Sequence, residues 1–102
     1  APVPIKVVPE ASPEERRRQT AVRREQEKNS RQRVKRIETR TAMIDAELAA
    51  LEAKLADPAT YNGPTSEMMR LGQLQAELRG EKEALETEWL ELVEQMETQA
   101  TP

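Results

Sequence analysis

A short segment in the middle of the chain forces a bend between two stretches that each have a helical pattern. This segment, Asp-Pro-Ala-Thr-Tyr-Asn-Gly-Pro at residues 57–64, holds two prolines and a glycine. Proline lacks the backbone donor that a helix interior needs and clashes with the preceding turn. Residues 14–56 contain neither proline nor glycine. The sequence therefore predicts a first helix over about 14–56, a loop over 57–65 and a second helix over about 66–98.

Each stretch carries one stripe of mainly apolar residues at alternating spacings of three and four, the pattern of a heptad seam. The first stripe is Val34, Ile37, Thr41, Ile44, Leu48, Leu51 and Leu55. The second is Met68, Leu71, Gln75, Leu78, Lys82, Leu85, Trp89, Leu92 and Met96. Neither helix alone can shield its stripe from water, so the two must face each other. We expect an all-α fold, a two-helix antiparallel coiled-coil hairpin with a flexible N-terminal linker.

The short connection between the stripes sets a register. Ile44 then lies opposite Leu78, and Val34 lies opposite Trp89. The polar seam residues Gln75 and Lys82 are expected to fix the pairing. The first helix is longer than its partner can cover, so residues 14–26 lack an apolar mate and are expected to fray.

The two ends of the chain differ from the middle. Residues 1–13 contain four of the seven prolines and are predicted to be a linker. Ser12 is suited to cap the first helix, with Pro13 in its first turn. Residues 99–102 are predicted to be a tail.

Composition argues against enzymatic chemistry. The chain has no His and no Cys, and it has no Gly-rich phosphate-binding loop. We therefore expect no catalytic residue, no metal site and no cofactor. No apolar run reaches the roughly 20 residues that span a bilayer. We expect a non-catalytic, cytoplasmic protein with no membrane partner.

Charge is distributed unevenly along the chain. Residues 14–40 hold 11 basic and five acidic residues, whereas residues 41–102 hold four basic and 13 acidic residues. A basic helix of this kind is typical of contact with a nucleic-acid phosphate backbone, although a merely solvated helix explains it equally well. The candidate nucleic-acid-binding residues are Arg16, Arg17, Arg18, Arg23, Arg24, Lys28, Arg31, Arg33, Lys35 and Arg36.

The proposed register divides this basic run in two. Residues 27–40 lie opposite residues 83–96, which hold five glutamates and no basic residue, so their charge is expected to be largely neutralised. Residues 16–26, with five basic residues and one acidic residue, have no such counterpart. Of the two aromatic residues, Trp89 is expected in the seam, and Tyr61 is expected to fold over Leu55 and Met68.

Two sequence features are specific: Leu-Glu-x-Lys-Leu-x-Asp-Pro-x-x-Tyr at residues 51–61 and the late Trp-Leu-Glu at residues 89–91. With these features, the region from Arg33 onward resembles the C-terminal domain of class F ATP-binding-cassette proteins. The resemblance implies a parent with two ATPase cassettes that acts on ribosomes in translation, and an accessory domain that contacts ribosomal RNA or branched DNA. The cassette motifs are missing from this chain, which is not expected to bind ATP. A similar hairpin ends valyl-tRNA synthetases, but the Asp-Pro-x-x-Tyr stretch favours the cassette family.

Two functions remain open from the sequence. The first is nucleic-acid or ribosome binding through the Arg-rich start of the first helix. The alternative is a protein-interaction or self-association coiled coil that docks on the parent ATPase cassettes or on another partner. Weak self-association belongs to this second function.

Overall fold

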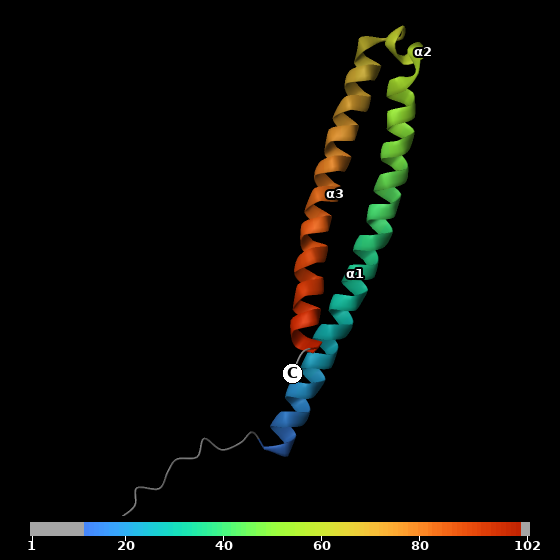
Figure 1. Ribbon diagram of the computed structural model, residues 1–102. Helices are drawn as coiled ribbons and strands as arrows, with labels where there is room; N and C mark the ends of the chain where they lie inside the picture. The colour runs from blue at the N-terminus through green and yellow to red at the C-terminus, as the bar shows by residue number, and fades with distance from the viewer. Residues whose placement is uncertain (1–11, 101–102) are drawn as a thin grey trace, which may run out of the picture.

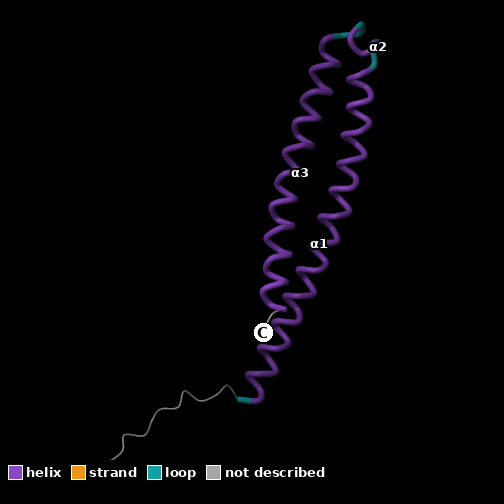
Figure 2. Tube along the Cα trace, in the orientation of Figure 1, coloured by secondary structure: helices purple, strands orange, loops and turns teal. Residues whose placement is uncertain are grey.

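The chain folds as two long antiparallel helices that lie side by side (Figure 1). The computed structural model describes residues 12–100. The first long helix is α1 (Pro13–Ala56), the second is α3 (Thr65–Ala100), and the one-turn helix α2 (Pro58–Tyr61) joins them at one end. Figure 2 shows that this described part is helix throughout, apart from short connections. The predicted all-α antiparallel hairpin is confirmed, whereas most of the predicted linker, residues 1–11, lies outside the described residues.

The start of α1 follows from its first residues. The Ser12 hydroxyl accepts a hydrogen bond from the backbone N–H of Glu15 at 3.2 Å. Pro13 occupies the first turn, where its missing donor costs nothing, and Glu14 and Glu15 favour the positive end of the helix dipole. The predicted cap at Ser12 is confirmed.

One residue, Asp57, both ends α1 and starts α2. Its backbone is extended, and its N–H still donates to the carbonyl of Lys54 at 3.2 Å. Its side chain accepts from the backbone N–H of Ala59 at 3.0 Å, which caps α2, and Pro58 occupies the first turn. The segment expected to be a loop therefore contains one helical turn, because an aspartate before a proline is itself a helix start.

The core of the hairpin is a thin line of aliphatic residues. Ile44, with no exposed surface, packs in one cluster with Leu51 of α1 and with Leu71 and Leu78 of α3. Ile37 is also buried. The partly buried residues around the cluster are Leu48, Leu55, Leu74 and Leu85. All of these except Leu74 belong to the two predicted stripes, and Leu74 flanks the second.

Ion pairs between the helices fix their relative position. Arg40 pairs with Glu81 at 2.7 Å, and Arg33 pairs with Glu88. On each helix the two partners are seven residues apart, so successive pairs repeat along one side of the hairpin. Arg33 and Glu88 directly precede Val34 and Trp89, which were expected to face each other, so these pairs agree with the predicted register.

A polar residue within the second stripe also joins the helices. The Lys82 ammonium lies 2.7 Å from Asp45 of α1 and 3.9 Å from Glu86. Its side chain is only one-third exposed, because the stem lies at the interface while the charged end reaches the carboxylate. Lys82 therefore bridges the two helices at the position where the sequence predicted a register-setting residue.

The two long helices differ in length, which leaves one end of α1 without a neighbour. α1 has 44 residues and α3 has 36. The N-terminal end of α1, blue in Figure 1, projects beyond the red end of α3. We call residues 13–26 the projecting segment. Its single branched aliphatic residue, Val22, is 55% exposed.

Candidate nucleic-acid interface

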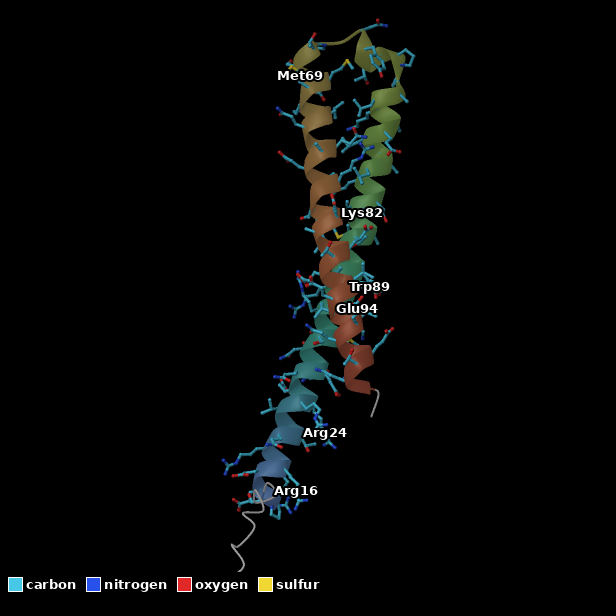
Figure 3. The ribbon with its side chains drawn as sticks, turned by 60° about the vertical axis from the view of Figure 1, so that its left-hand side comes forward. Arg16, Arg24, Met69, Lys82, Trp89 and Glu94 are labelled. Carbon is cyan, nitrogen blue, oxygen red and sulfur yellow. The ribbon has the colours of Figure 1, made fainter. Side chains whose placement is uncertain are left out.

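The projecting segment presents several of the candidate arginines to solvent. Arg16, Arg17 and Arg24 line a shallow depression together with Thr20 and Ala21. Figure 3 shows Arg16 and Arg24 on the part of α1 that extends past α3. The spacings of this set, close to one and two helical turns, place its members on one side of the helix. The depression is therefore a basic surface with small side chains between the charges.

Helical spacing extends this basic side toward the hairpin. Arg17, Arg24 and Arg31 recur every seven residues and so share a face of α1, while Lys28 and Lys35 lie one helical turn beyond Arg24 and Arg31. All five are exposed, and none forms an ion pair within the part of the chain that the structure describes. This face can therefore offer its full charge to an anionic ligand.

Other candidates are less available. Arg18 lies 4.0 Å from Glu14, but both side chains are about four-fifths exposed, so the pair adds little stability and leaves the guanidinium accessible. Arg33 is engaged across the hairpin: its Nη2 donates to Oε1 of Glu88 at 2.8 Å, and its Nε also donates to that carboxylate. Arg33 therefore stabilises the hairpin and has few donors left for a phosphate.

The remaining candidates lie outside the basic depression. Arg23 belongs to a row of α1 residues that are seven apart and share one face. This row runs Arg16, Arg23, Ser30, Ile37 and Ile44. Arg23 is exposed and belongs to the projecting segment, which extends past the end of α3 (Figure 1). Arg36 is exposed on the side of α1 away from α3. The ten candidates therefore lie on several sides of α1, because neighbouring residues on a helix point in different directions.

The end of α3 bounds the basic surface with negative charge. Glu91 and Glu94 are exposed near this end, and the last turn of α3 has no basic residue to offset the negative end of the helix dipole. Glu94 is labelled on this part of α3 in Figure 3. Negative charge at the end of α3 therefore adjoins the basic projecting segment.

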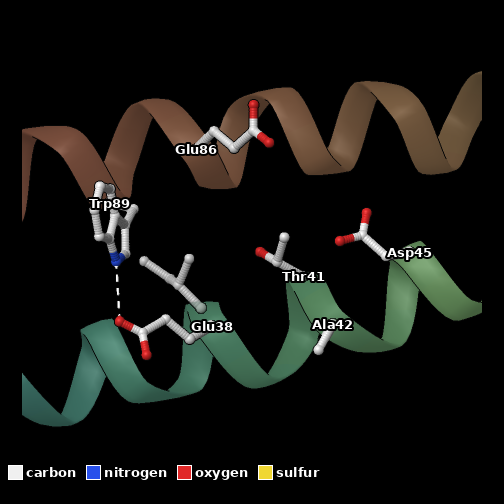
Figure 4. Close-up of a pocket in the computed structure, with 7 residues that line it drawn as sticks. Glu38, Thr41, Ala42, Asp45, Glu86 and Trp89 are labelled. Atoms are coloured by element: carbon white, nitrogen blue, oxygen red, sulfur yellow. Dashed lines mark hydrogen bonds between the residues drawn. The ribbon is translucent and has the colours of Figure 1, made fainter.

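The two aromatic residues, Trp89 and Tyr61, differ in how much of each is exposed. Trp89 is half-buried, and its indole Nε1 donates to Oε1 of Glu38 at 3.1 Å, as Figure 4 shows. It forms one wall of a groove between α1 and α3 that also includes Ile37, Thr41 and Asp45. Tyr61 was expected to cover Leu55 and Met68, but this prediction was wrong. Its side chain is 62% exposed, because α2 holds it on the outer end of the hairpin.

The Arg33–Glu88 pair makes stability depend on pH. The hydrogen bond from Arg33 lowers the pKa of Glu88 below its ordinary 4.5. A carboxyl group with a lowered pKa stabilises the fold above its ordinary pKa, and this contribution is lost as the pH falls through the folded-state value. We expect Glu88→Gln to lower the melting temperature at pH 7, and the gap to wild type to shrink at pH 3. Thermal melts followed by circular dichroism test this.

Glu83→Gln is the matched control, because Glu83 is exposed on the same helix and makes no ion pair in the described structure. It should melt close to wild type at both pH values. A gap between Glu88→Gln and wild type that persists undiminished at pH 3 would contradict the assigned role of the pair.

The residues that the structure describes offer neither a metal site nor a membrane span. No cluster of three or more acidic, His or Cys side chains is arranged to hold a metal ion within residues 12–100. Across the same residues, no helix combines the length and the apolar character needed to cross a bilayer.

Comparison with known proteins gives one match. A family model described as the ABC transporter C-terminal domain matches residues 25–94, which is more than half of the chain. The matched range contains nearly all of the hairpin and starts at the inner end of the projecting segment. No curated protein and no solved structure matches the chain.

Proposed function

The chain belongs to the ABC transporter C-terminal domain family, typical of class F ATP-binding-cassette ATPases, and we propose that it binds nucleic acid on behalf of such an ATPase. In this proposal the hairpin is a rigid spacer, and the projecting segment of α1 contacts phosphates. The chain itself performs no chemistry. The parent would act in the cytoplasm, with ribosomal RNA or branched DNA as the ligand.

The observation that carries the proposal is the uncovered basic end of α1. Five arginines fall within residues 16–24, and α3 ends before it can neutralise them (Figure 3). Of these, Arg18 alone has an ion-pair partner among the described residues, and that pair is long and exposed. Basic side chains without acidic partners are the groups that displace counterions from a phosphate backbone.

The chemistry of this surface favours backbone contact over base recognition. Residues 12–60 contain no aromatic side chain, so α1 lacks the aromatic platforms on which successive bases stack. Arginines that contact phosphates position a protein on its ligand without reading the base sequence. The ligand is therefore expected to be a structured or double-stranded nucleic acid recognised by charge and shape.

The test is a titration of the isolated chain with structured RNA and with branched DNA at two salt concentrations. With five phosphate contacts, wild-type affinity should fall by roughly 100-fold to 1,000-fold between 50 and 200 mM salt. The variant with Arg16, Arg17, Arg18, Arg23 and Arg24 all changed to Gln should bind far more weakly at low salt. It should also lose most of the salt dependence.

A matched pair of double variants controls for net charge. Arg16→Gln with Arg24→Gln removes two charges from the projecting segment, and Arg70→Gln with Arg79→Gln removes two exposed charges from α3. The first should weaken binding by about tenfold or more, and the second should leave it nearly unchanged. Equal affinity of the five-residue variant and wild type for both nucleic acids would overturn the proposal.

A further inference from the structure

One row of charged residues along α1 is self-complementary. Its members are seven residues apart and therefore share one face of the helix. The row runs from basic to acidic: Arg17, Arg24, Arg31, Glu38, Asp45 and Glu52. When the row is read backwards from Glu52 to Arg17, each position carries the opposite charge to the same position of the forward row. We call this set the charged row.

All six side chains of the charged row are exposed on the surface of the hairpin. The basic half has no ion-pair partner among the described residues. In the acidic half, Glu38 accepts a hydrogen bond from Trp89 through Oε1, Asp45 pairs with Lys82 through Oδ1, and Glu52 lies 3.8 Å from Arg79 through Oε1. A carboxylate can accept several hydrogen bonds, so the second oxygen of each group can still receive an arginine.

We propose that two copies of this chain associate antiparallel along α1 through the charged row. Arg17 of one copy then faces Glu52 of the other, Arg24 faces Asp45, and Arg31 faces Glu38. Twofold symmetry repeats each contact, which gives six opposite-charge pairs and no like-charge pair in the row. A parallel arrangement in the same register would instead place every charge beside its own sign.

The row cannot satisfy itself within one molecule. Arg24 and Asp45 lie on the same unbroken helix, 21 residues apart, so roughly 30 Å of α1 separates them. A helix cannot fold back on itself over that distance. The unpaired arginines of one copy can therefore reach the acidic half of the row only in a second copy.

A groove beside the acidic half fits the basic face of the second copy. It lies between Glu38 and Asp45, has a volume of about 270 Å³, and is also lined by Ala42 and Trp89 (Figure 4). In the antiparallel pairing, Lys28 of the second copy comes opposite residues 41–42. Its apolar stem can enter the groove, and its ammonium can lie over the indole or beside the carboxylates.

Small residues next to the row allow the second helix to approach. Ala21, Ala42 and Ala49 lie four residues after Arg17, Glu38 and Asp45, and all three are exposed. The corresponding places after Arg24 and Arg31 hold Lys28 and Lys35, whose flexible stems can bend aside as the two helices approach. The charge pattern, the groove and the small residues all lie on the same side of α1.

Sedimentation equilibrium of the isolated chain, without nucleic acid, tests the association itself. We expect a monomer–dimer equilibrium that weakens with added salt, since exposed charge pairs are screened. Changing Arg17, Arg24 and Arg31 to Glu turns all six pairs repulsive and should weaken the dimer by about 100-fold or more. Changing Arg18, Arg23 and Arg36 to Glu alters the net charge equally but leaves the row intact, so it should retain the dimer.

A wild-type chain that stays monomeric up to millimolar concentration would overturn the proposal. So would a dimer that the two triple variants weaken equally, because the charged row would then not be its interface. No nucleic acid is present in these measurements, so their outcome does not depend on the titrations described above.

Single cysteines test the antiparallel geometry, because the chain has no cysteine of its own. In the proposed pairing Ala21 of one copy lies beside Ala49 of the other, while the two Ala21 positions are roughly 40 Å apart. Under oxidation, a mixture of Ala21→Cys and Ala49→Cys chains should form a heterodimeric disulfide. Each variant alone should not cross-link, and self-cross-linking of either one faster than the mixture would overturn the antiparallel arrangement.

Discussion

Replacing Ile44 by Asp is expected to unfold the hairpin at 25 °C. Ile44 has no exposed surface and packs in the central cluster with Leu51, Leu71 and Leu78. The substitution removes an aliphatic side chain, which alone costs about 2–5 kcal/mol, and it also forces a carboxylate into the apolar interface. A core with so few buried residues has little stability to lose, so we expect loss of the helical circular-dichroism signal.

The neighbouring residue supplies the control for this substitution. Met43 is 52% exposed on the same turn of α1. Met43→Asp introduces the same charge into the same helix without burying it, and it should remain folded with a melting temperature within a few degrees of wild type. If Ile44→Asp melted at the same temperature as Met43→Asp, the assigned core would be wrong.

Replacing Ala46 by Pro is expected to be nearly as damaging, for a different reason. Ala46 is exposed in the middle of α1, so no side-chain contact is lost. Proline there removes a helix hydrogen bond and clashes with the preceding turn, which costs about 3 kcal/mol or more. The free energy of unfolding, measured by urea titration, should fall by this amount, because the two interlocked stripes require α1 to be continuous.

The same substitution in the projecting segment should have little effect on the hairpin. Ala21 is exposed in the projecting segment, which extends past α3 in Figure 1, so breaking the helix there should leave the contacts between α1 and α3 in place. Ala21→Pro should reduce the helical signal but leave the unfolding midpoint of the hairpin almost unchanged. Equal losses of stability at positions 21 and 46 would show that the projecting segment is not independent of the hairpin, and that its expected fraying is wrong.

The hairpin and its register were predictable because they depend on spacing alone. The apolar stripes repeat every seven residues, and the proline-containing segment leaves the second helix no direction but back along the first. Once one layer is set, the periodicity sets the others, so Arg40 meets Glu81 one residue before Thr41 and Lys82. The prediction needed no knowledge of individual side-chain conformations.

Details at the end of the hairpin were harder to predict. Asp57 and Pro58 are suited to start a helix, but a run with two prolines and a glycine was interpreted as a loop, so α2 was missed. This one turn then directs Tyr61 outward. The hydrogen bond between Trp89 and Glu38 was missed as well, because it depends on which way the indole ring turns within its seam position.

The availability of individual arginines could be predicted only in part. Counting charges over residues 27–40 and 83–96 predicted that the basic charge of residues 27–40 is largely neutralised. In the described structure Arg33 and Arg40 pair with glutamates of α3, whereas Arg31, Lys35 and Arg36 are exposed with no ion pair. The difference arises because a helix presents only one side to its partner, so charge totals overestimate the number of pairs.

The length of α1 separates the two ends of the molecule electrically. From Arg24 to Ala56 the helix extends for roughly 48 Å, several times the distance of about 8 Å over which physiological salt screens a charge. A charge changed near Tyr61 should therefore have no measurable effect on an anion bound at Arg24. The free-energy effects of substitutions at the two ends should simply add. Fluorescent probes attached beside Tyr61 can report on tumbling of the rod without disturbing its arginine end.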